Sequence, residues 1–215
     1  MLPLLYYITD CDQFPGSRQE KERRMLAKIA ECATVGVDYI QLREKDLSIH
    51  ALEILANQAI AALAVGPQTK LLINSRTDIA LACGAHGVHR PANDLSASEV
   101  RAIFARTRAP APVIGVSAHS IAEVASAETQ GADFAVFAPV FEKAGESNPE
   151  GLEQLRKTCH RPKTSGASMP VLALGGITLA NARLCLEAGA AGIAAVRLFQ
   201  QNDVCQIVKK LREDR

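Results

Sequence analysis

The sequence has no tryptophan, and aromatic residues make up only 4 % of its 215 positions. Hydrophobic residues nevertheless account for 48 % of the chain, so a core must be built mainly from alanine, leucine, isoleucine and valine. This composition suits parallel strands that are buried on both faces. The length fits one domain, near the lower end of the range for an eightfold βα barrel.

The chain also lacks an apolar run of about 18 residues, which a membrane-spanning helix would need. Its first ten residues, MLPLLYYITD, have neither the charged start nor the cleavage site of a signal peptide. Lysine and arginine number 24 against 23 aspartates and glutamates, which gives a net charge of +1. We therefore expect a cytoplasmic protein with no nucleic-acid or membrane partner.

Cysteine pairs at C-x-x-C spacing are absent, and no histidine completes a zinc-binding pattern. The six cysteines are Cys11, Cys32, Cys83, Cys159, Cys185 and Cys205. Most of them lie within apolar, helix-like patterns. The sequence therefore predicts reduced, buried thiols, as in a cytosolic protein.

Short apolar runs alternate with helix-like stretches along the whole chain, which is typical of βα units and a parallel sheet. We expect strands at Leu4–Thr9, Asp38–Leu42, Lys70–Asn74, Gly87–His89, Val113–Ser117, Phe134–Ala138, Val171–Leu174 and Gly192–Val196. We expect helices at Arg18–Val35, Ser48–Ala64, Arg76–Cys83, Ser96–Phe104, Ile121–Thr129, Gly151–Cys159, Leu179–Ala188 and Val204–Arg212.

Eight such units could close into a barrel or open into a doubly wound sheet. The G-x-G-x-x-G motif that a dinucleotide-binding sheet carries after its first strand is missing here. We therefore predict an α/β fold in which residues 1–215 form a single (β/α)8 TIM barrel. Helix boundaries carry local signals: N-caps are expected at Ser48, Ser96, Ser120 and Thr178, and helix-ending glycines at Gly36, Gly84, Gly131 and Gly189.

The active site of such a barrel lies at the carboxyl ends of its strands. Gly175 and Gly176 follow the seventh strand and precede a helix, where free backbone amides and the helix dipole favour a phosphate. Arg197, at the end of the eighth strand, could add a cation. The alternative is a tight turn without a ligand, with Arg197 as a surface charge.

Arg43 and Lys45 follow the second strand, where the strand period of two would place them on the same side. Two cations on one side require an anion, and diphosphate is the obvious candidate. The alternative is an ion pair with Glu44 or Asp94.

His119 follows Ser117 by two residues at the end of the fifth strand. A histidine in this place could transfer protons, or it could cap or cover the next helix. His89, at the end of the fourth strand, is expected to hydrogen-bond inside the barrel rather than to bind a metal.

Taken in order, these strand ends resemble those of the thiamine phosphate synthase family and its sister, the thiazole tautomerases. The resemblance covers nearly the whole chain, in the segments YYITD, GVDYIQLREKDLS, LLINSRTDIALACGAHGVH, IGVSAHS, GADFAVFAPVF, PVLALGGIT and AGAAGIAAV. The segment GVDYIQLREK is the most specific, whereas GGIT and GADF are shared more loosely among phosphate-binding barrels.

The resemblance implies a transferase of thiamine biosynthesis that joins hydroxymethylpyrimidine diphosphate to thiazole phosphate, releases diphosphate and uses Mg²⁺. Its partners would be small phosphorylated heterocycles, and it would be a homo-oligomer. Carried over by position, the diphosphate would be bound by Gln41, Arg43, Lys45 and Ser117, the pyrimidine by Asn74, Mg²⁺ by Asp94 and the thiazole phosphate by the Gly176 amide.

Three positions depart from the family pattern. Ser75 stands where the family has an aspartate that binds Mg²⁺, and a hydroxyl is a poorer ligand for this ion. After the sixth strand, Glu146 occupies the place of a lysine, although Lys143 could reach the same anion. Arg197 replaces a small serine.

These departures keep two alternatives open. A tautomerase would isomerise a thiazole carboxylate phosphate without metal or diphosphate, and His119 occupies the position of its histidine. A non-catalytic protein would only bind thiamine intermediates. The intact run from Gln41 to Lys45 favours the synthase, whereas Ser75 and the altered loop after the sixth strand do not.

Overall fold

The structure, a computed structural model, describes residues 2–63, 68–91, 94–141, 149–162 and 168–213. Its strands are β1 (Leu4–Ile8), β2 (Tyr39–Leu42), β3 (Lys70–Asn74), β4 (Gly87–Arg90), β5 (Val113–Ala118), β6 (Phe134–Phe137), β7 (Val171–Ala173) and β8 (Gly192–Ala195). Its helices are η1 (Cys11–Gln13), α1 (Arg18–Thr34), α2 (Ile49–Ala62), α3 (Thr77–Cys83), α4 (Ala97–Arg106), α5 (Ile121–Thr129), α6 (Pro149–Cys159), α7 (Leu179–Glu187), α8 (Arg197–Gln200) and α9 (Val204–Glu213).

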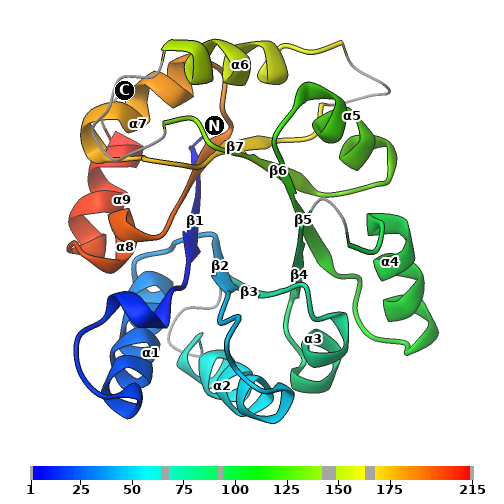
Figure 1. The fold of residues 1–215 in the computed structure, drawn as a ribbon, viewed down its shortest axis with the longest axis vertical. Coiled ribbons are helices and arrows are strands. Elements are labelled where there is room, and N and C mark those ends of the chain that lie inside the picture. The colour runs from blue at the N-terminus through cyan, green and yellow to red at the C-terminus, as the bar shows by residue number, and fades with distance from the viewer. Residues whose placement is uncertain (1, 64–67, 92–93, 142–148, 163–167, 214–215) are drawn as a thin grey trace.

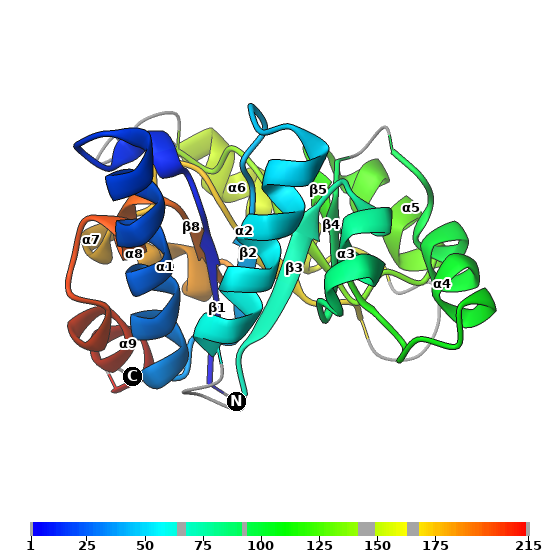
Figure 2. The same cartoon turned by 90° about the horizontal axis from the view of Figure 1, so that it is seen from below.

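All neighbouring strands pair in parallel and close into one barrel, in which β8 pairs with β1. Figure 1 shows the strands surrounded by the helices, and the side view in Figure 2 places the start of β1 and the end of α9 near the same, lower end of the barrel. The register sets Ile8 opposite Gln41, and Asn74 opposite His89. The closed barrel confirms the predicted TIM fold and excludes the open, doubly wound sheet.

The predicted element boundaries agree with the observed ones to within two residues. The hydroxyls of Ser48, Ser96 and Ser120 each accept a hydrogen bond from a backbone N–H in the first turn of the following helix, which confirms them as N-caps. Thr178 occupies the N-cap position of α7, but its hydroxyl has no hydrogen-bond partner among the described residues. Positive φ values, between 67° and 100°, are found at all four predicted helix-ending glycines: Gly36, Gly84, Gly131 and Gly189. The short helices η1 and α8 were not predicted.

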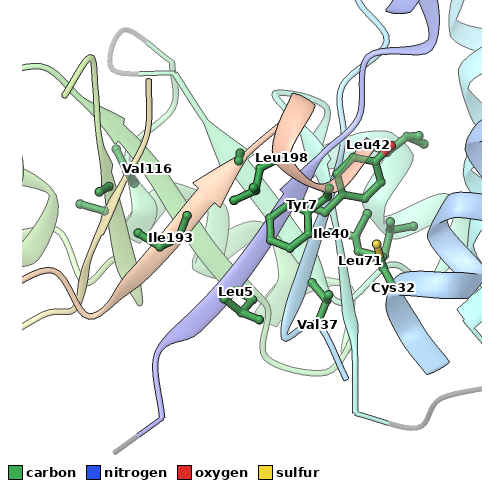
Figure 3. Packing of buried hydrophobic residues seen from close by; sticks show 14 of the residues in the cluster. Leu5, Tyr7, Cys32, Val37, Ile40, Leu42, Leu71, Val116, Ile193 and Leu198 are labelled. Atoms are coloured by element: carbon green, nitrogen blue, oxygen red, sulfur yellow. The ribbon is translucent and has the colours of Figure 1, made fainter. Parts of the chain in front are cut away.

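Hydrophobic side chains fill two layers of the fold. The larger cluster lies between the strands and the helices, and Figure 3 shows Leu5, Tyr7 and Ile40 within it. The smaller cluster fills the barrel itself, where the rings of Tyr39 and Phe134 stack with their centroids 5.0 Å apart. Because these two residues begin β2 and β6, the aromatic packing closes the amino-terminal half of the barrel and leaves the polar residues near the opposite end.

All six cysteines are free, in agreement with the predicted reduced thiols. Cys11, Cys32 and Cys185 are buried, Cys83 and Cys159 are half-buried, and Cys205 is exposed, so the expectation of burial is wrong for Cys205 and only partly met by Cys83 and Cys159. In the part of the chain that the structure describes, no helix is both long enough and apolar enough to cross a bilayer.

Candidate active site

The carboxyl ends of parallel strands meet at one rim of a closed barrel, and most of the residues selected from the sequence follow these ends. The residues gathered at this rim are Gln41, Arg43, Lys45, Asn74, Asp94, Ser117, His119, Gly175, Gly176 and Arg197. Lys143 lies outside the described residues. The two cations after β2 and the two glycines after β7 therefore lie at the same end of the molecule, as a site for a phosphorylated ligand requires.

Arg43 and Lys45 lie in the loop after β2, because this strand ends at Leu42. The strand period from which they were predicted to share a side therefore does not extend to them. Arg43 is half-buried and Lys45 is exposed. Among the described residues, neither side chain forms an ion pair. Both charges are thus available for an anionic ligand.

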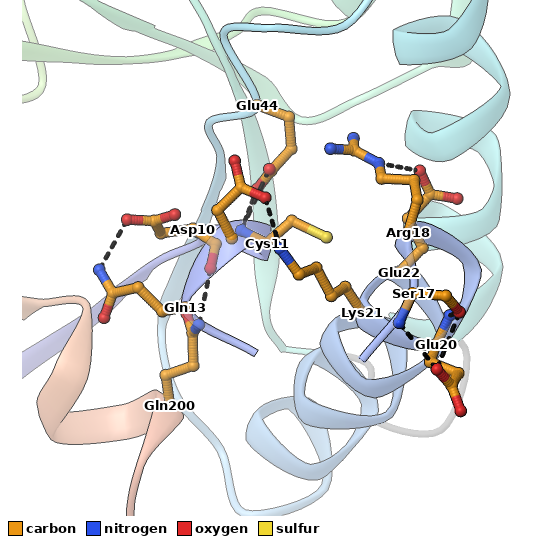
Figure 4. Close-up of polar contacts among 11 residues, drawn as sticks. Asp10, Cys11, Gln13, Ser17, Arg18, Glu20, Lys21, Glu22, Glu44 and Gln200 are labelled. Atoms are coloured by element: carbon orange, nitrogen blue, oxygen red, sulfur yellow. Dashed lines mark hydrogen bonds and ion pairs between the residues drawn. The ribbon is translucent and has the colours of Figure 1, made fainter. Parts of the chain in front are cut away.

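Glu44, one of the two carboxylates considered as a partner for these cations, binds neutral groups instead. It accepts hydrogen bonds from the Thr9 hydroxyl at 2.7 Å and from the Cys11 N–H at 3.1 and 3.2 Å, the latter shown in Figure 4. Burial raises the pKa of Glu44. The Thr9 oxygen also accepts from the N–H of Arg43 at 2.9 Å. These bonds tie the loop after β2 to the end of β1, a support for Arg43 that no sequence pattern indicated.

His89 and Ser117 form a hydrogen bond inside the barrel, just below the rim. His89 Nε2 lies 2.8 Å from Ser117 Oγ, and His89 is only 3 % exposed. Burial, and then the nearby charges of Arg43 and Arg90, lower the pKa of His89 to about 3. The imidazole is therefore neutral at physiological pH. The expectation that His89 hydrogen-bonds within the barrel is confirmed.

Gln41 is buried in the same interior, where its side chain already has a partner. Its Nε2 donates to the Tyr6 hydroxyl at 2.9 Å. Burial raises the pKa of Tyr6, so this hydroxyl keeps its proton. The amide nitrogen carries a second N–H, so Gln41 can still donate to a ligand, and its predicted role in gripping a diphosphate stays a prediction.

Asn74 and Ser75 form a tight corner after β3. Ser75 has a φ of 61°, a left-handed conformation that asparagine, aspartate and glycine adopt more readily. Its N–H donates to the carbonyl oxygen of His89 at 2.9 Å. Its hydroxyl accepts from Asn74 Nδ2 at 3.2 Å. The corner is therefore anchored to β4, and both side chains are half-buried at the rim.

Asp94, the predicted Mg²⁺ ligand, is exposed in the loop after β4 and accepts a hydrogen bond from the N–H of Leu95 at 2.8 Å. The described residues contain no group of three or more His, Cys, Asp or Glu that could hold a metal ion. Mg²⁺ is often held by one or two carboxylates together with the phosphates of a substrate. A metal at Asp94 would therefore depend on oxygens that a phosphorylated ligand brings.

Gly175 and Gly176 form the turn between β7 and α7, with φ values of 105° and 60°. A Cβ at Gly175 would lie 2.9 Å from Pro139 Cα, so the chain after β6 packs directly against this turn. Asn181 of α7 holds the turn in place, because its Nδ2 donates to the Gly176 carbonyl at 3.0 Å and its Oδ1 accepts from the Thr178 N–H at 2.7 Å. The turn presents backbone at the amino end of α7, the geometry on which helix phosphate sites depend.

Arg197 is the first residue of α8 rather than part of the eighth strand, and its side chain is exposed. Leu198 and Phe199 in the same short helix are buried. Many TIM barrels place a short extra helix here and bind phosphate at its amino end. A role for Arg197 in phosphate binding stays a prediction.

His119 is exposed after β5 and bonds to the chain after β6. Its Nδ1 lies 2.7 Å from the carbonyl oxygen of Ala138. A carbonyl can only accept, so Nδ1 carries the proton and Nε2 is the basic nitrogen of the neutral ring. The backbone N–H of His119 donates to Glu123 Oε2 at 2.6 Å and so covers the first turn of α5. Proton transfer by His119 stays a prediction.

Comparisons with known proteins point to one family. Residues 5–199 match the model of the family described as thiamine monophosphate synthase. The chain is 38 % identical to a putative thiamine-phosphate synthase 2 of Aquifex aeolicus, over 92 % of this chain and 98 % of that protein. It is 33 % identical to a thiamine-phosphate synthase of Halalkalibacterium halodurans, over 98 % and 96 % of the two chains. A solved thiamine phosphate pyrophosphorylase from Pyrococcus furiosus is 29 % identical, with a TM-score of 0.76 over 98 % of this chain and 94 % of that one.

Proposed function

The chain belongs to the thiamine monophosphate synthase family, and we propose that it is a transferase that joins hydroxymethylpyrimidine diphosphate to thiazole phosphate. The observation that carries this proposal is the barrel rim, where Arg43 and Lys45 lack carboxylate partners among the described residues and the Gly175–Gly176 turn offers a second phosphate site. The named relatives are synthases or putative synthases, which favours this reaction over the isomerase and the non-catalytic binder.

In the proposed reaction, the bond between the pyrimidine methylene carbon and the diphosphate oxygen breaks, and its electron pair leaves with diphosphate. The thiazole nitrogen then supplies the electron pair of the new C–N bond. Negative charge accumulates on the leaving diphosphate, so fixed cations and hydrogen-bond donors around it would lower the barrier. Arg43, Lys45 and the Ser117 hydroxyl would supply them.

The two rings need to be held in line, because positioning converts an encounter of two substrates into a reaction within one complex. Asn74 would orient the pyrimidine end of the first substrate, and the second N–H of Gln41 would donate to its diphosphate. The Gly176 amide would hold the phosphate of the thiazole, with Arg197 as a further cation near this end of the rim. Lys143 would add a charge from the loop after β6.

Mg²⁺ is part of this proposal and would be held by Asp94 together with diphosphate oxygens. The donor set on the protein is small, because Ser75 supplies a hydroxyl where the family pattern has a second carboxylate. One carboxylate and a diphosphate suffice in principle for this ion. When bound, the ion would neutralise charge on the leaving group.

Diphosphate release from the two purified substrates tests the proposed function. We expect release and thiamine phosphate formation to require both substrates and to be stimulated by Mg²⁺. Arg43→Ala should lower kcat/KM by at least about a hundredfold, since it removes a charged contact to the leaving group (about 2.7 kcal/mol). His119→Ala is the matched control. Synthase activity should survive this substitution, whereas the isomerase alternative depends on His119. No diphosphate under saturating Mg²⁺ would refute the proposal.

The small set of Mg²⁺ ligands in this proposal leads to a separate prediction. Ser75→Asp should lower the Mg²⁺ concentration for half-maximal activity by roughly tenfold, or about 1.4 kcal/mol of binding, because it adds a carboxylate at the rim. Ser75→Asn is the matched control, since asparagine suits the same left-handed backbone without the charge. An equal shift in both variants would show that the new carboxylate does not reach the metal.

We further propose that the protein works in the cytoplasm on small phosphorylated heterocycles and forms a homo-oligomer. Six free cysteines support a reducing compartment. Light scattering of the purified protein at several concentrations tests the oligomer, and a monomer mass at all of them would exclude it.

A further inference from the structure

The hydrogen bond between His89 and Ser117 joins a residue that faces the proposed ligand to one that does not. His89 is fully enclosed within the barrel, whereas Ser117 is partly exposed near the end of β5. The space for the imidazole depends on Gly115, where a Cβ would lie 2.9 Å from His89 Nδ1. The ring is therefore held in a fixed position beneath the Ser117 hydroxyl.

The surroundings of the imidazole determine which nitrogen carries its proton. Nδ1 is buried and has no hydrogen-bond partner among the described residues. A proton on Nδ1 would create a buried N–H without an acceptor, which is rarer in proteins than an unpaired acceptor. The proton therefore belongs on Nε2, which donates to Ser117 Oγ at 2.8 Å.

A serine hydroxyl has one hydrogen to donate and two lone pairs that accept. With one lone pair occupied by the Nε2–H of His89, the Ser117 hydrogen must point to another acceptor. The opposite tautomer would have the reverse effect, because Ser117 would donate into the barrel and turn only lone pairs to a ligand. An anion at the rim would be repelled by those lone pairs and attracted by the hydrogen.

We propose that His89 is a positioning residue that makes Ser117 a hydrogen-bond donor to the diphosphate group of the substrate. The inference rests on the proposed function, in which Ser117 faces that group. The neutral ring of His89 orients the Ser117 hydroxyl and adds no charge, since burial and the nearby Arg43 and Arg90 keep the pKa of His89 far below physiological pH. The positive charge at the rim thus comes from Arg43 and Lys45.

Binding of inorganic diphosphate, measured by calorimetry, tests the inference together with kcat and KM. His89→Met removes the donor at similar volume and should weaken diphosphate binding about tenfold, as expected for a lost hydrogen bond to an anion. His89→Gln can place an N–H close to the position of Nε2 and should restore binding to within about threefold of the wild type.

A double-mutant cycle distinguishes positioning from a general structural role. Ser117→Ala alone should weaken diphosphate binding. Adding His89→Met to this variant should weaken binding no further, because the two residues act as one unit. A further tenfold loss in the double variant would overturn the proposal, as would unchanged binding in His89→Met.

The tautomer can be observed directly, without any substitution, from the ¹⁵N shifts of His89 in labelled wild-type protein. We expect a neutral ring protonated at Nε2 throughout pH 5 to 8, and a proton on Nδ1 would overturn the proposal. This measurement needs neither substrate nor turnover. If the wild type forms no product, the proposed function fails while the tautomer is still decided; if it forms product but His89→Met equals the wild type, only this inference fails.

Discussion

Two polar side chains inside the barrel, His89 and Gln41, each bind a hydroxyl on a neighbouring strand. Gln41 donates to Tyr6, and His89 is bonded to Ser117. Buried polar groups without partners are unfavourable by about 1–3 kcal/mol each, so these pairs make a polar barrel interior compatible with folding. They also fix the side chains directly beneath the proposed ligand site.

Because the imidazole of His89 is buried, we expect the free energy of unfolding to depend on pH. The pKa of His89 is lowered from 6.5 to about 3 on folding, so between these values the unfolded chain binds a proton that the folded chain does not. Its contribution to the free energy of unfolding should therefore fall as the pH is lowered from about 6.5, by at most about 1.4 kcal/mol per pH unit.

Urea unfolding of the wild type and His89→Gln between pH 4 and 8 measures this effect. The glutamine variant should show a flatter dependence below pH 6.5, while the two proteins should run parallel above it. His50→Gln is a suitable control, since His50 is exposed on α2. Equal slopes for all three proteins would contradict the assignment to His89.

At the scale of elements, the glycines of the barrel have two different tasks. Gly84 ends α3 with a φ of 67°, and a Cβ there would meet no atom within 4 Å. Gly175 has a φ of 105° and packs against Pro139 of the neighbouring loop. The first glycine serves only the backbone conformation, whereas the second also allows two loops of the rim to touch.

Alanine at each position separates these tasks. Gly84→Ala should lower the free energy of unfolding by about 1 kcal/mol, the effect of a left-handed alanine, and leave kcat/KM unchanged. Gly175→Ala should destabilise by about 2–3 kcal/mol and lower kcat/KM, because the turn must move away from Pro139. Thermal unfolding and kinetics on both variants test this, and equal losses of activity would contradict it.

At the scale of the whole molecule, the six thiols report on the integrity of the barrel. Cys205 is exposed on α9, whereas Cys11 and Cys185 are buried. Burial raises the pKa of Cys11 to about 11 and that of Cys185 to about 12. Reactivity towards a thiol reagent requires the exposed thiolate, so burial and protonation both protect the interior cysteines.

In the native protein, the exposed Cys205 should therefore react fastest with Ellman's reagent at pH 8, ahead of the half-buried Cys83 and Cys159, whose pKa values burial raises. Cys205→Ser should remove this rapid phase, and denaturant should expose the remaining cysteines. Reducing agents should leave the melting temperature unchanged, since no cysteine is paired. Rapid reaction of the buried Cys11, Cys32 and Cys185 in the native state would show that the helical layer opens more readily than the packed barrel indicates.

The sequence alone was sufficient to predict the elements and their order, because these depend on local chemistry. Apolar runs, serine N-caps and helix-ending glycines act within a few residues of one another, and the strands from Leu4 to Ala195 lie close to where those signals placed them. The candidate rim followed from the same order, since loops after parallel strands share one end of a barrel.

Only the tertiary structure decided the closure of the sheet and the partners within the site. The bonds from Gln41 to Tyr6, from His89 to Ser117 and from Glu44 to Thr9 join residues 28 to 35 positions apart. Sequence period could not place Arg43, because its strand ends one residue earlier. Such pairings depend on register, strand ends and the curvature of a closed barrel, which arise when all eight strands pack together and are not encoded in any local pattern.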